Sequence, residues 1–267
     1  MSFGTLFDTI LLGLVEGLTE FLPVSSTGHL ILADDLLGFK GPPGQVFEIV
    51  IQLGAILAIC VLYFRKLLGV LLGAPTDPAA RRFILNLLWA FLPAAVVGVL
   101  AHGFIKSVLF SPWVVSVSLI VGGLAILVIE RMRPAPIYHD VDDLPASVAF
   151  KIGCAQVLAM IPGVSRAGAT IMGAMLVKVD RRAATEFSFF LAIPTMFAAT
   201  VYDLYKNRAA LSADDLLVIA IGFGGRVPVG AGGGAGADRF VSRHGFAPFA
   251  WYRLLVGALM LGLLIAR

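Results

Sequence analysis

The stretch EGLTEFLPVSSTGH, residues 16–29, interrupts an otherwise strongly apolar chain and decides how we expect that chain to fold. Glu16 and Glu20 are four residues apart, so they share one face of a helix. Pro23 and the hydroxyl-rich run after it break that helix and free backbone N–H groups. Such backbone survives inside a membrane only where protein encloses it or where it lines a wet cavity. We therefore expect this stretch to carry out chemistry or transport.

The composition of the chain indicates a polytopic membrane protein. Of its 267 residues, 59% are hydrophobic and only 14% are charged, whereas soluble domains average about 25% charged residues. The formal net charge is +3, and the basic residues cluster in short loops instead of forming a nucleic-acid patch. Cys60 and Cys154 lie in apolar segments, so the sequence predicts no disulfide framework and no cysteine metal site.

Two interrupted segments organise the rest of the chain. Residues 5–15 and 30–39 are each shorter than the ~20 residues of a membrane crossing, so with the first motif they predict a re-entrant helical hairpin. Residues 148–178 repeat this pattern around PGVSRAGAT, residues 162–170. Basic residues in the loops that follow residues 64 and 130 place those loops on the cytoplasmic side. Crossings are predicted at 47–64, 83–101, 112–130, 187–205, about 216–237 and 248–266.

The order of these segments predicts an inverted repeat. Three crossings follow each hairpin, and an odd number of crossings turns the second half upside down. We predict an all-α polytopic membrane protein, one domain over 1–267, with six transmembrane helices and two re-entrant hairpins in pseudo-repeat halves 1–130 and 148–267. Inverted repeats place their sites near the midplane, where broken helices meet. The two motifs should therefore face each other.

One predicted crossing has an unusual composition. The run GGRVPVGAGGG, residues 224–234, makes a poor transmembrane helix because glycine and proline weaken it and Arg226 would be buried. Two explanations are open: a local shift of the coding frame within residues 224–236, or a tightly packed glycine-rich helix.

The buried charges need partners. Glu16, Glu20 and Arg166 would together cost roughly 8–10 kcal/mol at the bilayer centre if they were unpaired. An ion pair that only joins the two hairpins is the simplest explanation. The second motif also has the features of an anion site, because Gly163 and Gly168 let backbone N–H groups approach a ligand. Its helix would start within 165–170, and the guanidinium of Arg166 suits phosphate oxygens.

The carboxylate pair would repel an anion unless a cation lay between them. Two carboxylates, phosphate oxygens and waters are a common way to hold Mg²⁺. A diphosphate bound with a divalent cation, Mg²⁺ or Ca²⁺, would satisfy every charge, so we predict Glu16 and Glu20 as metal ligands.

Hydroxyl and imidazole side chains in the first motif suit hydrolysis. Ser26 is a candidate nucleophile, with water as the other candidate, and His29 is a candidate base or acid. Ser25 and Thr27 could bind the phosphate or cap the loop. Glu48 and Gln52 could line the same cavity or form a helix–helix hydrogen bond. The remaining histidines, His102, His139 and His244, are expected in loops without comparable neighbours.

Both motifs resemble the signatures of the bacterial undecaprenyl-diphosphate phosphatase family, also called the bacitracin-resistance family. Residues 47–54 (FEIVIQLG) and 246–253 (FAPFAWYR) are similar to further stretches of that family. The resemblance covers nearly the whole chain, and the first motif is long enough to be specific. One departure is Ala167, which stands where the family usually has a further serine.

The resemblance implies an integral inner-membrane enzyme that uses a divalent cation and faces the periplasm. It would remove one phosphate from the C55 lipid diphosphate, recycle the carrier lipid of cell-wall synthesis and confer bacitracin resistance. The family's acidic pair corresponds to Glu16 and Glu20, and its serine and histidine to Ser26 and His29. Its phosphate-binding motif corresponds to Ser165, Arg166 and Thr170.

Two questions stay open at this point. Inverted repeats with broken helices also suit alternating access, so the alternative function is a transporter or flippase of a polyprenyl phosphate. The oligomeric state is also open, and a homodimer is one option.

Overall fold

The computed structural model describes residues 3–38, 42, 46–224, 240–241 and 244–267, and within these ranges the fold is helical. The glycine-rich run lies almost entirely outside the described residues, so the two explanations for it concern a part of the chain that the structure does not describe. The elements are α1 (Phe3–Thr19), α2 (Ser26–Leu37), α3 (Val46–Val50), α4 (Gln52–Leu62), α5 (Phe64–Gly73), α6 (Pro78–Phe104), η2 (Ile105–Leu109), α7 (Pro112–Met132), η3 (Val141–Asp143), α8 (Ala146–Val157), η4 (Leu158–Met160), α9 (Arg166–Leu176), α10 (Arg181–Asn207), α11 (Ala213–Gly224) and α13 (Ala247–Ala266).

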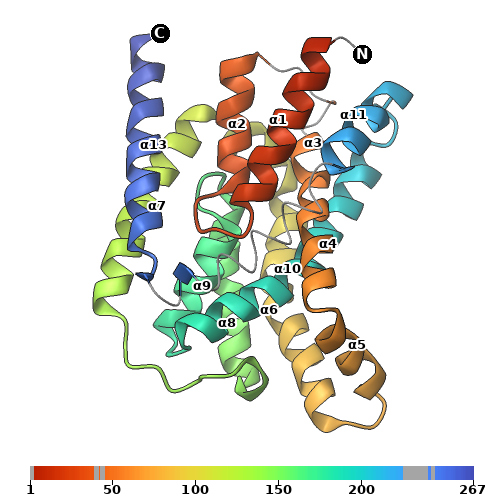
Figure 1. The fold of residues 1–267 in the computed structure, drawn as a ribbon, viewed down its shortest axis with the longest axis vertical. Helices are drawn as coiled ribbons and strands as arrows, with labels where there is room; N and C mark the ends of the chain where they lie inside the picture. Colours follow the sequence, from red (N-terminus) through yellow and green to blue (C-terminus); the bar gives the residue numbers. More distant parts are fainter. Residues whose placement is uncertain (1–2, 39–41, 43–45, 225–239, 242–243) are drawn as a thin grey trace.

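The two predicted hairpins are present, and each is a pair of short helices joined by non-helical backbone. α1 and α2 form the first, and α8 and α9, with the short 3₁₀ turn η4, form the second. In Figure 1 the open end of the first hairpin lies with the chain termini, whereas α8 starts toward the opposite end of the molecule. The hairpins therefore enter from opposite ends and meet in the middle of the molecule.

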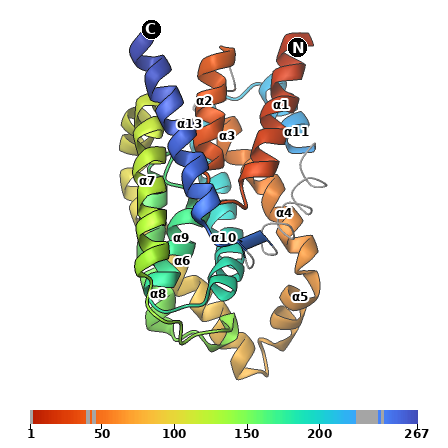
Figure 2. The same cartoon turned by 60° about the vertical axis from the view of Figure 1, so that its left-hand side comes forward.

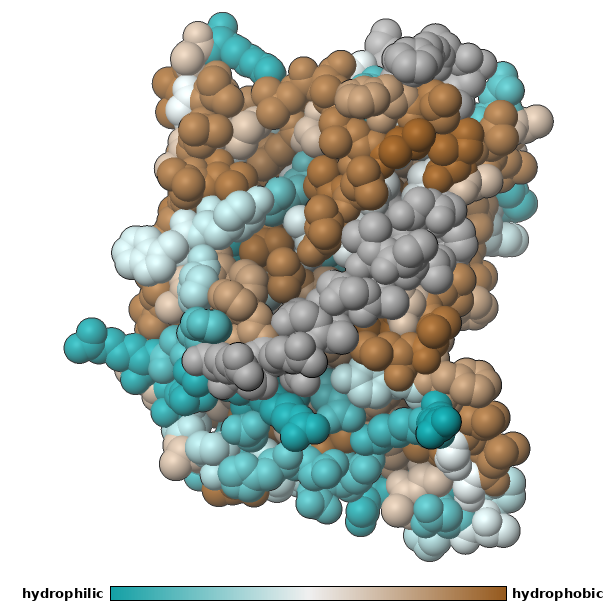
Figure 3. Space-filling model, viewed as in Figure 1, coloured by the Kyte–Doolittle hydropathy of each residue, from teal (hydrophilic) through white to brown (hydrophobic). Residues whose placement is uncertain are grey.

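Four helices are long and apolar enough to cross a membrane: Pro78–Leu109, Pro112–Met132, Arg181–Asn207 and Ala247–Ala266. Figure 2 shows α7 and α13 running side by side. In the view of Figure 3, apolar residues cover most of the height of the molecule and hydrophilic residues gather at its lower end. A multi-pass membrane protein is therefore confirmed.

The predicted count of six crossings is not confirmed in the described residues, which contain four candidate spans, or five if the bent pair Val46–Leu62 and Phe64–Gly73 is one span. The crossing predicted at 47–64 is interrupted at Ile51, and the chain then bends by 77° between Val46–Leu62 and Phe64–Gly73. After the bend, α5 buries none of its residues. Its Lys66 pairs with Asp142 and Glu186, each at 3.3 Å. These ion pairs hold a helix where the sequence predicted a loop. The crossing predicted at 216–237 is described only as far as the end of α11.

The acidic residues Asp140, Asp142 and Asp143 are exposed, and Val141 is buried where the chain forms the short turn η3. Asp140 caps this turn by accepting a hydrogen bond from the backbone of Asp142 at 3.0 Å. Nearby, the second hairpin packs closely on α6, because Gly153 on α8 lies against the backbone of Ala90.

Replacing Gly153 with valine should lower stability strongly, because its Cβ would collide with the main chain of Ala90, which cannot rotate away. We expect a loss of about 3 kcal/mol, the upper range for an overpacked core, measured as a lower thermal midpoint in detergent. Gly69→Ala is the control, since nothing lies within 4 Å of a Cβ at Gly69. Equal midpoints for both variants would contradict this account of the α6–α8 contact.

Candidate functional site

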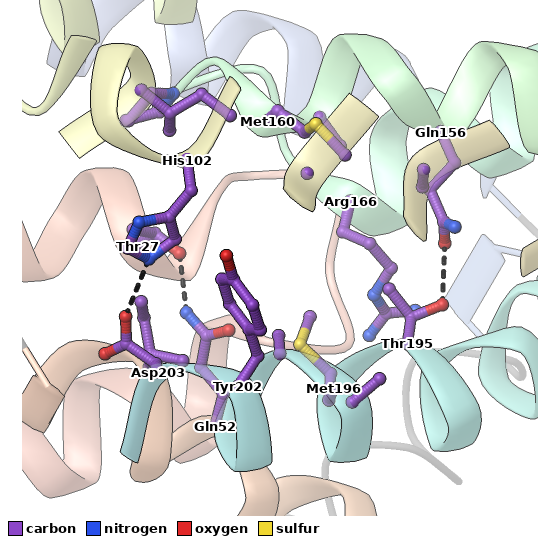
Figure 4. A pocket seen from close by; sticks show the side chains of 18 of the residues that line it. Thr27, Gln52, His102, Gln156, Met160, Arg166, Thr195, Met196, Tyr202 and Asp203 are labelled. Carbon is purple, nitrogen blue, oxygen red and sulfur yellow. Dashed lines mark hydrogen bonds and ion pairs between the residues drawn. The ribbon is translucent and has the colours of Figure 1, made fainter. Parts of the chain in front are cut away.

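A cavity of about 400 Å³ lies between the two hairpins, α4, α6 and α10. Glu20, Ser26 and Thr27 reach it from the first hairpin, and Ser165 and Arg166 reach it from the second. Figure 4 shows Arg166 toward one end of this cavity and His102 with Asp203 toward the other. We call these the Arg166 end and the His102 end. The prediction that the two motifs face each other is confirmed.

Glu20 is the central group of the Arg166 end. One carboxylate oxygen accepts a hydrogen bond from Arg166 Nη2 at 2.7 Å, and the other accepts a short one from the Ser26 hydroxyl. Glu20, Ser26 and Arg166 are all buried. The ion pair expected between the hairpins therefore exists, and it also holds the candidate nucleophile against a carboxylate.

Arg166 is held from behind by α10. Its Nη1 donates to the backbone oxygen of Ser188 at 2.9 Å and to the Ser188 hydroxyl at 3.3 Å. Thr170 lies in hydrogen-bond contact with the same hydroxyl at 2.7 Å. It is fully buried and is not among the residues that line the cavity. Ser188 was not among the predicted site residues, although a lone serine in the run EFSFFL was a detectable signal.

Two helices begin at the cavity with the same cap. Ser25 and Ser165 have positive φ angles of 69° and 79°, and each side chain accepts a hydrogen bond from the glycine three residues later. The first N–H groups of a helix point out of its N-terminus without intrahelical partners. α2 and α9 thus present two positive helix ends to one cavity, as an anion site requires. Capping is confirmed for Ser25, and the predicted helix start within 165–170 is confirmed as well.

Arg253 on α13 ties both broken loops together, and its side chain is fully buried. In the sequence, Arg253 is distant from both motifs. The carbonyl oxygens that accept its hydrogen bonds, at 2.7–3.4 Å, belong to Pro23, Gly163, Val164, Ser118 and Leu119. The sequence pattern at 246–253 assigned no role to Arg253. A charge within a predicted crossing was the available signal.

His29 points toward α13. Its Nδ1 contacts the Ser25 carbonyl oxygen and its Nε2 contacts the Tyr252 hydroxyl, both at 2.8 Å. The two rings stack with centroids 5.5 Å apart. His29 is not among the residues that line the cavity. Its role as a base or acid stays a prediction.

The remaining predicted polar residues divide between the cavity and its surroundings. Gln52 lines the cavity and donates to Thr27 Oγ1 at 2.6 Å, so it forms a helix–helix hydrogen bond as well. Glu48 is buried but does not line the cavity. Glu16 is fully buried and is not a lining residue either.

The expectation that His102 lies in a loop was wrong. It belongs to α6, lines the cavity and lies 3.2 Å from Asp203 on α10. Lys106 forms an ion pair with the same carboxylate at 2.6 Å. The crossing was predicted to end at residue 101, but α6 continues to Phe104 and the short helix η2 extends it to Leu109. His102 therefore lies within a helix.

The donors at the cavity fit a cation that arrives with a phosphate ligand. Among the described residues, no group of three or more His, Cys, Asp and Glu side chains could hold a metal ion. Glu20 is the carboxylate that lines the Arg166 end of the cavity, whereas Asp203 lines the His102 end. One carboxylate, with phosphate oxygens and waters as the other ligands, is a usual Mg²⁺ environment.

Fold and site together define an integral membrane protein with two opposed broken-helix hairpins around a buried carboxylate–arginine–serine cluster. The chain belongs to the family described as bacitracin resistance protein BacA, whose profile matches residues 9–259. It is 56% identical over 260 residues to undecaprenyl-diphosphatase 1 of Agrobacterium fabrum, covering 97% of each chain. It is 55% identical to undecaprenyl-diphosphatase 2 of Paramagnetospirillum magneticum, covering 98% of this chain and 100% of that one. With the undecaprenyl-diphosphatase of Cereibacter sphaeroides it shares 52% identity over 99% of each chain.

Replacing Arg253 with lysine should destabilise the protein by about 3 kcal/mol or more, because lysine keeps the charge but cannot reach the same set of carbonyl groups. The measurement is thermal denaturation in detergent without substrate. Arg267→Lys is the matched control, since Arg267 forms an exposed ion pair with Asp35 and should change stability by less than about 1 kcal/mol. A wild-type midpoint for Arg253→Lys would show that the clamp is dispensable.

Proposed function

We propose that this protein hydrolyses a polyprenyl diphosphate, undecaprenyl diphosphate in the cell, to the lipid monophosphate and inorganic phosphate. The observation that carries the proposal is the cluster of Ser26, Glu20 and Arg166 beneath two helix N-termini. Relatives at 52–56% identity over nearly the whole chain are named undecaprenyl-diphosphatase. Their names favour hydrolysis over transport alone.

The geometry gives each residue of the cluster a task. The Ser26 hydroxyl donates to Glu20, so the carboxylate can take its proton as the oxygen attacks the terminal phosphorus. The bond from phosphorus to the lipid phosphate oxygen breaks, and the lipid monophosphate leaves. Water then releases phosphate from the serine. Arg166 and the two helix ends stabilise the negative charge that builds on the phosphoryl oxygens. If water attacks directly, Glu20 is still the base within reach.

The cavity walls suit an isoprenoid chain. Ala94, Ala95, Gly98 and Val99 line it from α6, and Met196, Ala198 and Ala199 line it from α10. This apolar section continues along the two helices toward the His102 end. A diphosphate bound at Arg166 would therefore have its lipid tail between α6 and α10, with van der Waals contact to small side chains.

The distribution of basic residues supports an active site that opens away from the cytoplasm. Arg81, Arg131 and Arg181 lie at or near the ends of α6, α7 and α10 that are remote from the chain termini. Lys/Arg-rich loops stay in the cytoplasm. The His102 end adjoins the last turns of α6 and α10, on the other side. In a bacterial inner membrane this is the periplasmic side.

We further propose that a divalent cation accompanies the diphosphate. Glu20 would hold it together with phosphate oxygens, and Glu16, one helical turn earlier, would be the second carboxylate. Such a cation would neutralise charge on the phosphate oxygens. The proposal rests on Glu20 at the cavity wall and on the spacing that puts Glu16 on the same face of α1, four residues earlier.

Purified protein in detergent should release phosphate from farnesyl diphosphate, because hydrolysis needs no membrane to cross. Ser26→Ala and Arg166→Ala should each lower kcat/KM at least ~100-fold, the range for losing a nucleophile or a key charge donor. Ser111→Ala and Arg182→Ala, at residues outside the cavity, are the controls. Absent turnover in the wild type would favour pure transport, and full activity of Ser26→Ala would exclude serine attack.

Removing divalent cations should lower turnover by ~100-fold or more, since the phosphate charge would lose its neutralising partner. The measurement is phosphate release after treatment with EDTA, followed by titration with Mg²⁺ or Ca²⁺. Added cation should restore the wild type but not Glu20→Gln. Unchanged turnover in EDTA would refute the metal proposal and leave serine-based hydrolysis standing.

A further inference from the structure

The side chain of Gln156 on α8 is a buried amide that lines the cavity beside Arg166 (Figure 4). Its exposed fraction is 2%, and its Nε2 has no hydrogen-bond partner among the described residues. A buried amide without a partner costs free energy that folding alone does not recover. Such a group is expected where a ligand completes its hydrogen bonding.

Its surroundings orient this amide. The hydroxyl of Thr195 on α10 donates to the Leu191 backbone oxygen at 2.8 Å and lies 3.4 Å from the side-chain oxygen of Gln156. Thr195 thus lies beside the oxygen of the amide, and the NH2 group of Gln156 is left to donate to another group. Figure 4 shows Gln156 and Thr195 together at the Arg166 end, on the opposite side of Arg166 from His102 and Asp203.

Arg166 leaves a second donor in the same region. Its two terminal nitrogens bind Glu20 and Ser188, but its Nε is buried without a hydrogen-bond partner in the described part of the chain. Two unpartnered N–H donors, one of them cationic, need acceptor oxygens and bind most strongly to acceptors that carry negative charge. A phosphate group has this chemistry, whereas an apolar tail or a cation does not.

We propose that Gln156 is a substrate-binding residue whose amide donates to the terminal phosphate of the diphosphate and thereby helps to hold it for attack. The assignment to the terminal phosphate follows from the cavity walls. Their apolar section runs from Arg166 toward the His102 end, so the tail lies on that side. The group furthest from the tail then reaches Gln156. This inference rests on the proposed function for the identity of the ligand.

The test is binding of farnesyl methylenediphosphonate, a non-hydrolysable analogue, by isothermal calorimetry in detergent with Mg²⁺. Gln156→Met removes the donors at similar size and should weaken binding about tenfold, as for one hydrogen bond to a charged group. Gln156→Glu has the same shape but offers oxygens only, and should weaken binding ~100-fold. The same variants should raise KM for farnesyl diphosphate more than they lower kcat.

Asn86→Leu is the matched control. Asn86 on α6 is an equally buried amide, 2% exposed, but its Nδ2 already donates to the Leu144 backbone oxygen at 2.7 Å. Its replacement should lower the thermal midpoint of the free protein and leave diphosphonate affinity unchanged. Gln156→Met should do the opposite, keeping or raising the midpoint while binding weakens. A purely structural role for Gln156 could not produce this contrast.

The outcomes are separable. Wild-type affinity in Gln156→Met overturns the inference, because the amide would then bind only water. Retained affinity in Gln156→Glu overturns it too, since the amide would be acting as an acceptor. Failure of the wild type to bind the diphosphonate also refutes it. If the wild type binds the analogue and loses affinity on substitution but releases no phosphate from farnesyl diphosphate, the hydrolytic function fails while the role of Gln156 stands.

Discussion

The ion pair between Glu20 and Arg166, 2.7 Å apart, is the contact on which the rest of the structure depends. Each charge alone would be costly inside a bilayer, and together they connect hairpins that enter from opposite ends. Pairing alone does not account for the arrangement, because Ser26 binds the second oxygen of Glu20 and Ser188 binds Arg166. The pair therefore places the Ser26 hydroxyl, the Arg166 guanidinium and two helix ends around one cavity.

The two hairpins solve the same backbone problem in the same way. A helix that starts in the membrane interior must satisfy its first N–H groups. Ser25 and Ser165 each do so with a positive φ angle and a side chain bonded to the glycine three residues later. Each cap satisfies one N–H group and leaves the earlier ones facing the cavity. These unpaired N–H groups are therefore available as donors to an anion.

The sequence predicted those parts of the site that depend on residues close together in the chain. Proline, glycine and hydroxyl residues identified both breaks, and the cost of unpaired charge indicated that Glu20 and Arg166 should meet. The contacts of Arg253 could not be predicted, because its partners are carbonyl groups from three separate segments. Any residue can supply a carbonyl, so side-chain identities carry no signal for such contacts. The bend before α5 depends likewise on partners of Lys66 that lie distant in sequence.

The position of Arg253 in the last helix has a consequence for biogenesis. Both broken loops leave the ribosome long before the guanidinium that joins their carbonyl groups. Until α13 inserts, those carbonyls must bind water or components of the insertion machinery. A nascent chain that stops short of α13 would thus contain both motifs without the link between them. Assembly of the site is then a late event, coupled to the insertion of α13.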